Sequence, residues 1–190
     1  VSLLSQAEVD AFCGCEFILG GLIIGEDGQE NDITDLSKLN TIKRIEGAVR
    51  IRSTQLTDLS SLSGMFSFRS LRINSNNQLS QINAFNEAEE LLSINIHRND
   101  QLTEINGFKN LKKLESDLNI TTNDQLVRLN GFEQLEEAGA VRVSSNASLK
   151  VFEEFPNLKN VIGGEFVFYQ NPSLEQIDLP NLLSVDRLRI

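Results

Sequence analysis

The chain has 190 residues, of which 40% are hydrophobic, and this length and composition fit one globular domain with a continuous core. It carries 27 acidic and 17 basic residues, so the formal net charge is −10. This charge disfavours nucleic acid or an anionic membrane surface as the main partner, because both would repel the protein at long range.

Neither a membrane span nor an export signal is apparent in the sequence. No apolar run reaches the roughly 18 residues that a transmembrane helix needs, so we expect no direct membrane insertion. The N-terminus lacks a basic segment followed by an apolar one, so we expect any signal peptide to have been removed or never present. Two cysteines, Cys13 and Cys15, are too few for a disulfide scaffold or a zinc site.

The first expected element is a short amphipathic helix over Ser2–Phe12. Ser5 and Glu8 have the spacing of a capping box, and Leu4 and Val9 have that of a hydrophobic staple. A repeat array needs a cover over the core of its first repeat. We therefore assign residues 1–14 to an N-terminal capping helix and residues 15–190 to repeats of the same single domain.

Pairs of apolar residues that flank one outward position recur after this helix. The steps between their first members are 27, 22, 23, 24, 23, 25 and 22 residues. Such a constant period is typical of a solenoid, in which each coil buries its apolar face by stacking on its neighbours. The pairs are Leu22/Ile24, Val49/Ile51, Leu71/Ile73, Ile94/Ile96, Leu118/Ile120, Val141/Val143, Phe166/Phe168 and Leu188/Ile190.

Apolar residues spaced by three follow each pair, as Leu126, Leu129 and Phe132 do in the fifth coil. An ordinary leucine-rich repeat would form a helix in this part of the unit. From Phe108 to Leu118 there are only ten steps, which favours short extended pieces joined by turns. We therefore predict an all-β solenoid, a single right-handed β-helix of about eight coils.

An asparagine recurs three residues after the second member of five of these pairs. Its amide can turn inward and pair with the backbone of the coils above and below, which predicts a structural ladder. Thr54 takes this place in the second coil. The ladder asparagines are Asn76, Asn99, Asn123, Asn146 and Asn171.

The repeated units, each with a strand, an asparagine and spaced apolar residues, and the run Cys15–Ile24 resemble the receptor L domain, the leucine-rich β-helix of insulin- and EGF-receptor ectodomains. The segment Ser5–Phe12 also resembles the opening of L-domain-like modules in exported surface proteins of Bacteroidetes. The resemblance implies a secreted or surface-displayed module without enzymatic activity or cofactor, used for adhesion, recognition or spacing. Receptor L domains pair the cysteine that matches Cys15 with one well upstream, whereas here the other cysteine is Cys13. We expect this pair to be reduced or only partly oxidised.

The outward positions of the strands carry an unexpected cluster for an acidic protein. Arginine, amide and aromatic side chains on a rigid sheet could bind a carboxylated glycan or a partner protein. The alternative is that these side chains are solvated and prevent sheets from associating. The candidate ligand-binding face comprises Arg50, Arg52, Arg72, Asn95, His97 and Asn119.

Two alternatives to a recognition module remain. A polysaccharide-cleaving β-helix would need converging carboxylates, but the outward columns contain none, and His97 has no carboxylate or nucleophile at its level. We therefore expect no enzyme. A purely structural spacer is the second alternative, and it predicts no ligand.

Two further features of the sequence, an acidic loop and the position of Ile190, suggest hypotheses of their own. The acidic loop Glu26–Asp32 could hold calcium, but its spacing does not match an EF-hand loop, so we expect a solvated insertion without metal. Ile190 ends in the middle of a coil, so we expect a further closing segment or end-to-end stacking on another molecule.

Overall fold

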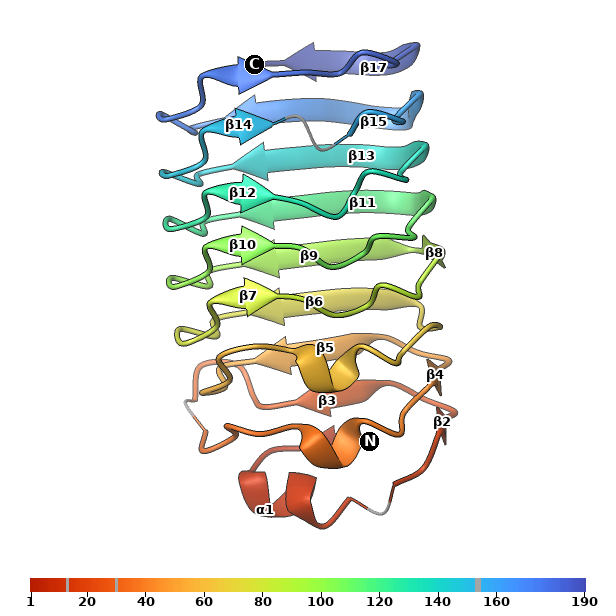
Figure 1. Cartoon of the computed structure of the whole chain (residues 1–190), viewed down its shortest axis with the longest axis vertical. Helices are drawn as coiled ribbons and strands as arrows, with labels where there is room; N and C mark the ends of the chain where they lie inside the picture. Colours follow the sequence, from red (N-terminus) through yellow and green to blue (C-terminus); the bar gives the residue numbers. More distant parts are fainter. Residues whose placement is uncertain (13, 30, 153–154) are drawn as a thin grey trace.

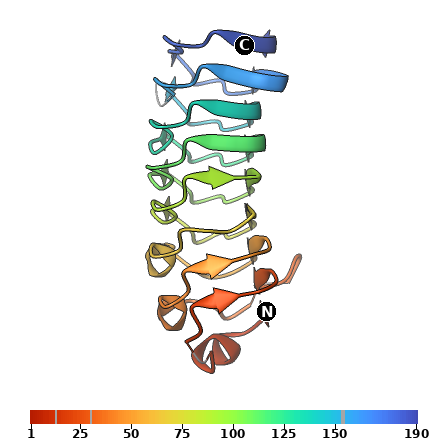
Figure 2. The same ribbon diagram turned by 90° about the vertical axis from the view of Figure 1, so that its right-hand side faces the viewer.

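The computed structural model describes residues 1–12, 14–29, 31–152 and 155–190. In these ranges the chain forms an all-β solenoid of about eight turns, as predicted, with its N-terminal helix at one end and β17 at the other (Figure 1). A view turned by 90° shows the coils as stacked layers (Figure 2). None of the described helices is long and apolar enough to cross a membrane.

One large parallel sheet runs the length of the solenoid. Within the described ranges it contains ten strands, and the coils from β3 to β15 contribute the predicted apolar pairs, whereas the last coil contributes Leu188 without Ile190. The strands are β1 (Ser2–Leu3), β3 (Leu22–Ile24), β5 (Val49–Arg52), β6 (Ser70–Asn74), β8 (Glu90–Leu91), β9 (Ser93–His97), β11 (Lys113–Thr121), β13 (Glu137–Ser144), β15 (Asn160–Tyr169) and β17 (Ser184–Arg189).

Shorter sheets and single turns of helix form the other walls. The short strands are β7 (Gln81–Ile82), β10 (Glu104–Ile105) and β12 (Arg128–Leu129) in one sheet, β14 (Val151–Phe152) with β16 (Gln176–Ile177), and β2 (Phe17–Ile18) with β4 (Arg44–Ile45). The helices are α1 (Gln6–Asp10) and the 3₁₀ turns η1 (Ser37–Leu39) and η2 (Ser60–Leu62).

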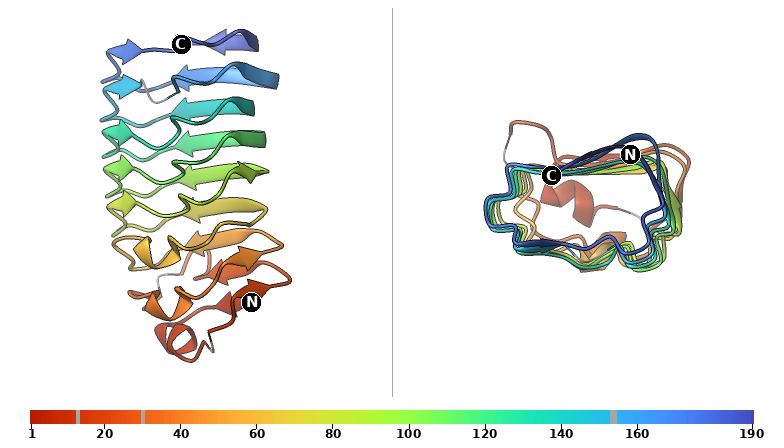
Figure 3. Two further views of the ribbon diagram at one scale, coloured as in Figure 1. Left: turned by 45° about the vertical axis from the view of Figure 1, so that its right-hand side comes forward. Right: turned by 90° about the horizontal axis from the view of Figure 1, so that it is seen from above.

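The coil is right-handed. In Figure 1 the large sheet lies at the back with its arrows pointing left, and each return path crosses the front to the right as the chain rises from the N-terminus. Seen from above, the coils superpose closely and the long sheet forms one straight side (Figure 3). This is the hand that parallel β-strand crossovers adopt in nearly all proteins.

The N-terminal segment differs from the prediction, because its helix spans only Gln6–Asp10. Ser2–Leu3 instead pair with β3 as strand β1. The helix begins at Ser5, whose hydroxyl accepts a hydrogen bond from the Glu8 N–H at 3.3 Å. The Glu8 carboxylate reaches the Leu4 N–H at 2.5 Å, so the Ser2–Leu4 backbone is held outside the helix. Leu4 is exposed, and the predicted staple with Val9 is therefore wrong.

The predicted absence of a regular helix in the repeats is confirmed, except for η1 and η2 in the first two coils. Each 3₁₀ turn follows an aspartate whose carboxylate accepts the N–H two residues on, Asp35 from Ser37 and Asp58 from Ser60, both at 2.8 Å. This Asx-type turn starts the helical turn. The coils of β7, β10 and β12 lack the aspartate at this position and have no 3₁₀ turn after it; their short strands begin at the position of the aspartate.

The interior is one continuous apolar core. Phenylalanines from four successive coils stack inside it, with ring centroids 5.3 to 5.6 Å apart; the stack comprises Phe85, Phe108, Phe132 and Phe155. All four rings are fully buried. Because each ring contacts its counterpart one coil away, the stacking couples the coils mechanically and energetically.

The asparagine column forms a hydrogen-bonded ladder along one corner. Asn123 is fully buried, and its Nδ2 donates to the carbonyls of Ile96 and Thr121 at 3.2 and 3.1 Å. Its own N–H donates to Asn146 Oδ1 at 3.1 Å. The residue before each ladder position has a positive φ, which turns the chain sharply; these residues are Ser53, Ser75, Arg98, Thr122, Ser145 and Gln170. The ladder therefore satisfies the backbone groups that this corner leaves unpaired.

Candidate functional site

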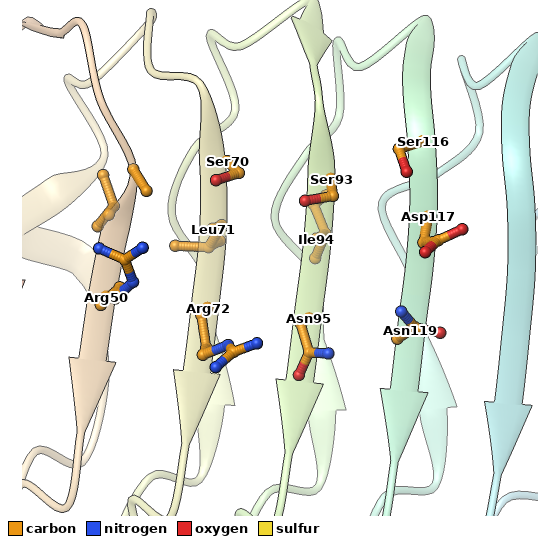
Figure 4. A pocket seen from close by; sticks show the side chains of 12 residues that line it. Arg50, Ser70, Leu71, Arg72, Ser93, Ile94, Asn95, Ser116, Asp117 and Asn119 are labelled. Atoms are coloured by element: carbon orange, nitrogen blue, oxygen red, sulfur yellow. The ribbon is translucent and has the colours of Figure 1, made fainter. Parts of the chain in front are cut away.

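The outward side chains of the large sheet lie in one row across neighbouring strands. Arg50 on β5 is in register with Arg72 on β6, Arg72 with Asn95 on β9, and Asn95 with Asn119 on β11. Figure 4 shows these four side chains on the same face of the sheet. The alternation of apolar inward and polar outward residues places them there.

A second row of small side chains runs beside the first. Ser70 and Ser93 are in register at the start of their strands, and Ser116 lies level with them (Figure 4). Long side chains in one row and short ones in the next leave a depression of about 290 Å³. We call it the sheet groove; its polar lining consists of Arg50, Ser70, Arg72, Ser93, Asn95, Ser116, Asp117 and Asn119.

Arg52 does not join Arg50 and Arg72 in an open arginine cluster, contrary to the prediction. Its guanidinium forms an ion pair with Asp27, and only 18% of its side chain is exposed. Asp27 also accepts a hydrogen bond from Asn74 Nδ2 at 3.0 Å. The side chain of Asp27 is 57% exposed, as expected for a solvated insertion, but its carboxylate also contacts Arg52 and Asn74 on the sheet and withdraws Arg52 from the face.

The contacts of Asp27 change its acidity. The hydrogen bond from Asn74, together with the hydrogen bond and charge of Arg52, lowers the pKa of the Asp27 carboxyl against a smaller opposing effect of burial. Arg72 contributes through its charge alone. Asp27 is thus held as a carboxylate at the edge of the candidate face.

A second depression of about 320 Å³ adjoins the sheet groove and shares Arg72 and Asn95 with it. Its other lining residues include Asp27 and His97. His97 is half-buried, and its Nδ1 lies 2.9 Å from Thr121 Oγ1. The outward positions of the strands predicted neither Asp27, which belongs to a separate loop, nor the hydroxyl partner of His97.

The carboxylates that line the two depressions, Asp27 and Asp117, lie in different depressions, and each has a cationic neighbour. Asp27 pairs with Arg52, and Asp117 lies 3.4 Å from Arg142. Glycoside hydrolysis requires two carboxyl groups that flank the same bond. Asp27 and Asp117 line different depressions and do not form such a pair, and the absence of enzymatic activity stays a prediction.

The calcium hypothesis receives no support from the described residues. They contain no group of three or more His, Cys, Asp or Glu side chains that could hold a metal ion. Asp27 faces a guanidinium, and Glu30 of the same loop lies outside the described residues. Cys15 is half-buried against the core, whereas Cys13 lies outside the described residues, so the redox state of the pair stays a prediction.

Parallel coils and an asparagine ladder define a leucine-rich β-solenoid, which has a polar groove on its long sheet. Residues 14–127 match the sequence profile of the family described as Receptor L domain. The chain therefore belongs to the receptor L domain family. No curated protein and no solved structure gives a significant match to the chain.

Proposed function

We propose that this protein is a noncovalent recognition module that binds a protein or glycan ligand on the outer face of its large sheet. Family membership supports a ligand-binding, receptor-like role. The observation that carries the proposal is the sheet groove, in which polar side chains of four successive coils line one depression. A rigid scaffold that presents such a surface needs little ordering on binding, which favours affinity.

We also infer that the module is secreted or displayed at a cell surface and serves there in adhesion. Receptor L domains are typically extracellular, and the likeness of Ser5–Phe12 to bacterial surface modules points the same way. Helix α1 lies within the outline of the coils when the solenoid is seen from above (Figure 3). Its buried Val9 supports a capping role at the first coil.

A structural spacer is the principal rival, and it predicts that no molecule binds the sheet face. The deciding experiment is a binding screen of the immobilised chain against glycans and extracellular proteins. Ser93→Trp, at a half-buried outward position of the groove, should abolish binding by filling the depression. Lys109→Trp, at an exposed position outside the groove, should bind like the wild type.

The outcomes of this screen separate the three functions. Binding that survives Ser93→Trp, or the absence of any bound ligand, would favour the spacer. Release of sugar fragments from polysaccharides by the wild-type chain would favour the enzyme. Loss of binding in Ser93→Trp alone, with both variants melting like the wild type, supports the recognition module.

A further inference from the structure

Arg50 and Arg72 form an unusual pair on the sheet face. Both side chains are exposed, and they occupy directly opposite positions on β5 and β6. Within the described ranges neither makes an ion pair or a side-chain hydrogen bond, whereas three other arginines along this sheet do: Arg52 with Asp27, Arg142 with Asp117 and Arg187 with Glu165.

Two like charges directly opposite each other on neighbouring strands destabilise a sheet. The carboxylate that lines the second depression, Asp27, interacts with Arg72 through charge but is hydrogen-bonded to Arg52 and Asn74. The remaining carboxylate of the groove, Asp117, lies toward its other end on β11, next to Arg142. The groove therefore has a cationic end at Arg50 and Arg72 and a neutral polar middle.

That middle is built from hydrogen-bonding side chains with no partner inside the described protein. Asn95 and Asn119 continue the arginine row, and Ser70, Ser93 and Ser116 form the parallel row (Figure 4). Their side chains make no hydrogen bond to other described residues. Amides and hydroxyls can each both donate and accept, which matches the hydroxyl groups of a sugar.

The composition of the groove disfavours a protein partner. The cores of protein interfaces are enriched in aromatic residues, methionine and arginine, and apolar anchor residues are buried there. The sheet groove has no aromatic residue, and three of its four apolar lining residues, Val49, Leu71 and Ile94, are buried with at most 2% exposure, while the fourth is the small Ala48. Its arginines and amides remain as the recognising groups.

On these grounds, and resting on the recognition function proposed above, we propose that the sheet groove binds a carboxylated glycan. Its carboxylate accepts hydrogen bonds from the guanidinium groups of Arg50 and Arg72, because the planar fork of arginine matches a carboxylate. Hydroxyl groups of the adjoining sugars bond to Asn95 and Asn119. The bound carboxylate relieves the repulsion between the two arginines.

The test uses an array of uronate-containing oligosaccharides, each printed beside its carboxyl-reduced neutral counterpart, and titration calorimetry for those that bind. We expect binding to the acidic member of a pair and at least tenfold weaker binding to the neutral member. Arg50→Ala and Arg72→Ala should each weaken the acidic interaction at least tenfold, and Arg72→Lys should recover part of it. Arg128→Ala, an exposed arginine on β12, is the matched control and should leave binding unchanged.

Stability measurements guard against a trivial loss of binding. Because Arg50 and Arg72 are exposed and repel each other, each alanine variant should melt at or above the wild-type temperature without ligand. A folded variant that no longer binds then reports on recognition alone.

Two results would overturn the carboxylate assignment while leaving the recognition function intact. One is equal binding of acidic and carboxyl-reduced oligosaccharides. The other is binding of an acidic or neutral protein that is lost in Ser93→Trp, when no uronate oligosaccharide competes with that protein for the groove. If no molecule binds the sheet face at all, the recognition function itself fails and the spacer stands.

Discussion

The side-chain oxygen of Asn123 accepts two hydrogen bonds from Asn99, one from its backbone N–H at 3.1 Å and one from its side-chain amide at 3.2 Å. Asn76 makes the same two bonds to Asn99, and Asn123 makes them to Asn146. The ladder thus passes from coil to coil through equivalent contacts. Each member holds the corner of its own coil and the corner of the coil before it.

Replacing Asn123 with alanine should therefore damage two coils. The buried N–H of Asn99 and the carbonyl of Ile96 would lose their partners, and we expect the free energy of unfolding to fall by about 3 kcal/mol. Urea denaturation followed by circular dichroism measures the change. Asn110→Ala, at an exposed position, serves as the control. An Asn123→Ala protein as stable as this control would contradict the structural role of the ladder.

Gly131 should not tolerate a side chain. It has a φ of +123°, and a Cβ built there would lie 1.7 Å from the carbonyl oxygen of Gly107 in the preceding coil. We expect Gly131→Ala to lose at least about 3 kcal/mol, because backbone strain adds to the displacement of a neighbouring coil. Gly28→Ala also has a positive φ but meets nothing within 4 Å, and it should lose only about 1 kcal/mol. If thermal unfolding gave the same loss of free energy for both variants, the close spacing of the coils would not be what excludes a side chain at Gly131.

Thr122 offers a stabilising substitution. Its φ is +56°, a region that is unfavourable for a β-branched residue and acceptable for asparagine. Its hydroxyl bonds to no other described residue. Thr122→Asn should raise the free energy of unfolding by about 1 kcal/mol, and Thr122→Val should not. Differential scanning calorimetry of both variants tests this, and a lower melting temperature for Thr122→Asn would refute the explanation.

The Asp27 contacts should make stability depend on pH. The folded-state pKa of Asp27 is lowered from 3.8, chiefly by the Asn74 hydrogen bond and then by Arg52. The folded protein therefore binds fewer protons at Asp27 than the unfolded chain does. The resulting stabilisation is fully present above the unfolded value and is lost as the pH falls through the folded value.

Thermal melts of wild type and Asp27→Asn across the acid range measure this effect. The wild type should be the more stable protein at neutral pH, and its advantage should shrink as the pH falls below 3.8. In an Asn74→Ala background the pH-dependent part of the advantage should be smaller. A difference between wild type and Asp27→Asn that does not vary with pH would mean that Asp27 makes no such contact in solution.

The local pattern of the chain predicts the solenoid well, because every coil repeats the same few constraints. Leu126, Leu129 and Phe132 are all fully buried, as their spacing indicates, and the apolar strand pairs fall in register from coil to coil. The predictions from sequence are wrong where a segment is not part of a repeat. Ser2–Leu3 look helical by local spacing but pair with β3, since the unpaired edge of the first coil offers them hydrogen bonds.

On the candidate ligand-binding face, too, the sequence predicts the repeated positions and fails for contacts with segments outside the repeat. Alternation along a strand predicts that Arg50, Arg72, Asn95 and Asn119 point outward, and register places them in one row. The fate of Arg52 cannot be read from alternation, because Asp27 reaches it from a loop 25 residues earlier. Whether an outward arginine is available to a ligand depends on contacts with segments that are not part of the repeat.

The sequence alone therefore determined the period, the inward and outward faces and the ladder, because stacking makes each of these a repeated, short-range requirement. Only the tertiary structure decided which outward side chains are free. The loop that carries Asp27 packs against the sheet and pairs with Arg52, whereas Arg50 and Arg72 stay unpaired within the described chain. The hollow beside them likewise depends on three serines from different coils lying level, which is a property of the stacked coils and not of any one of them.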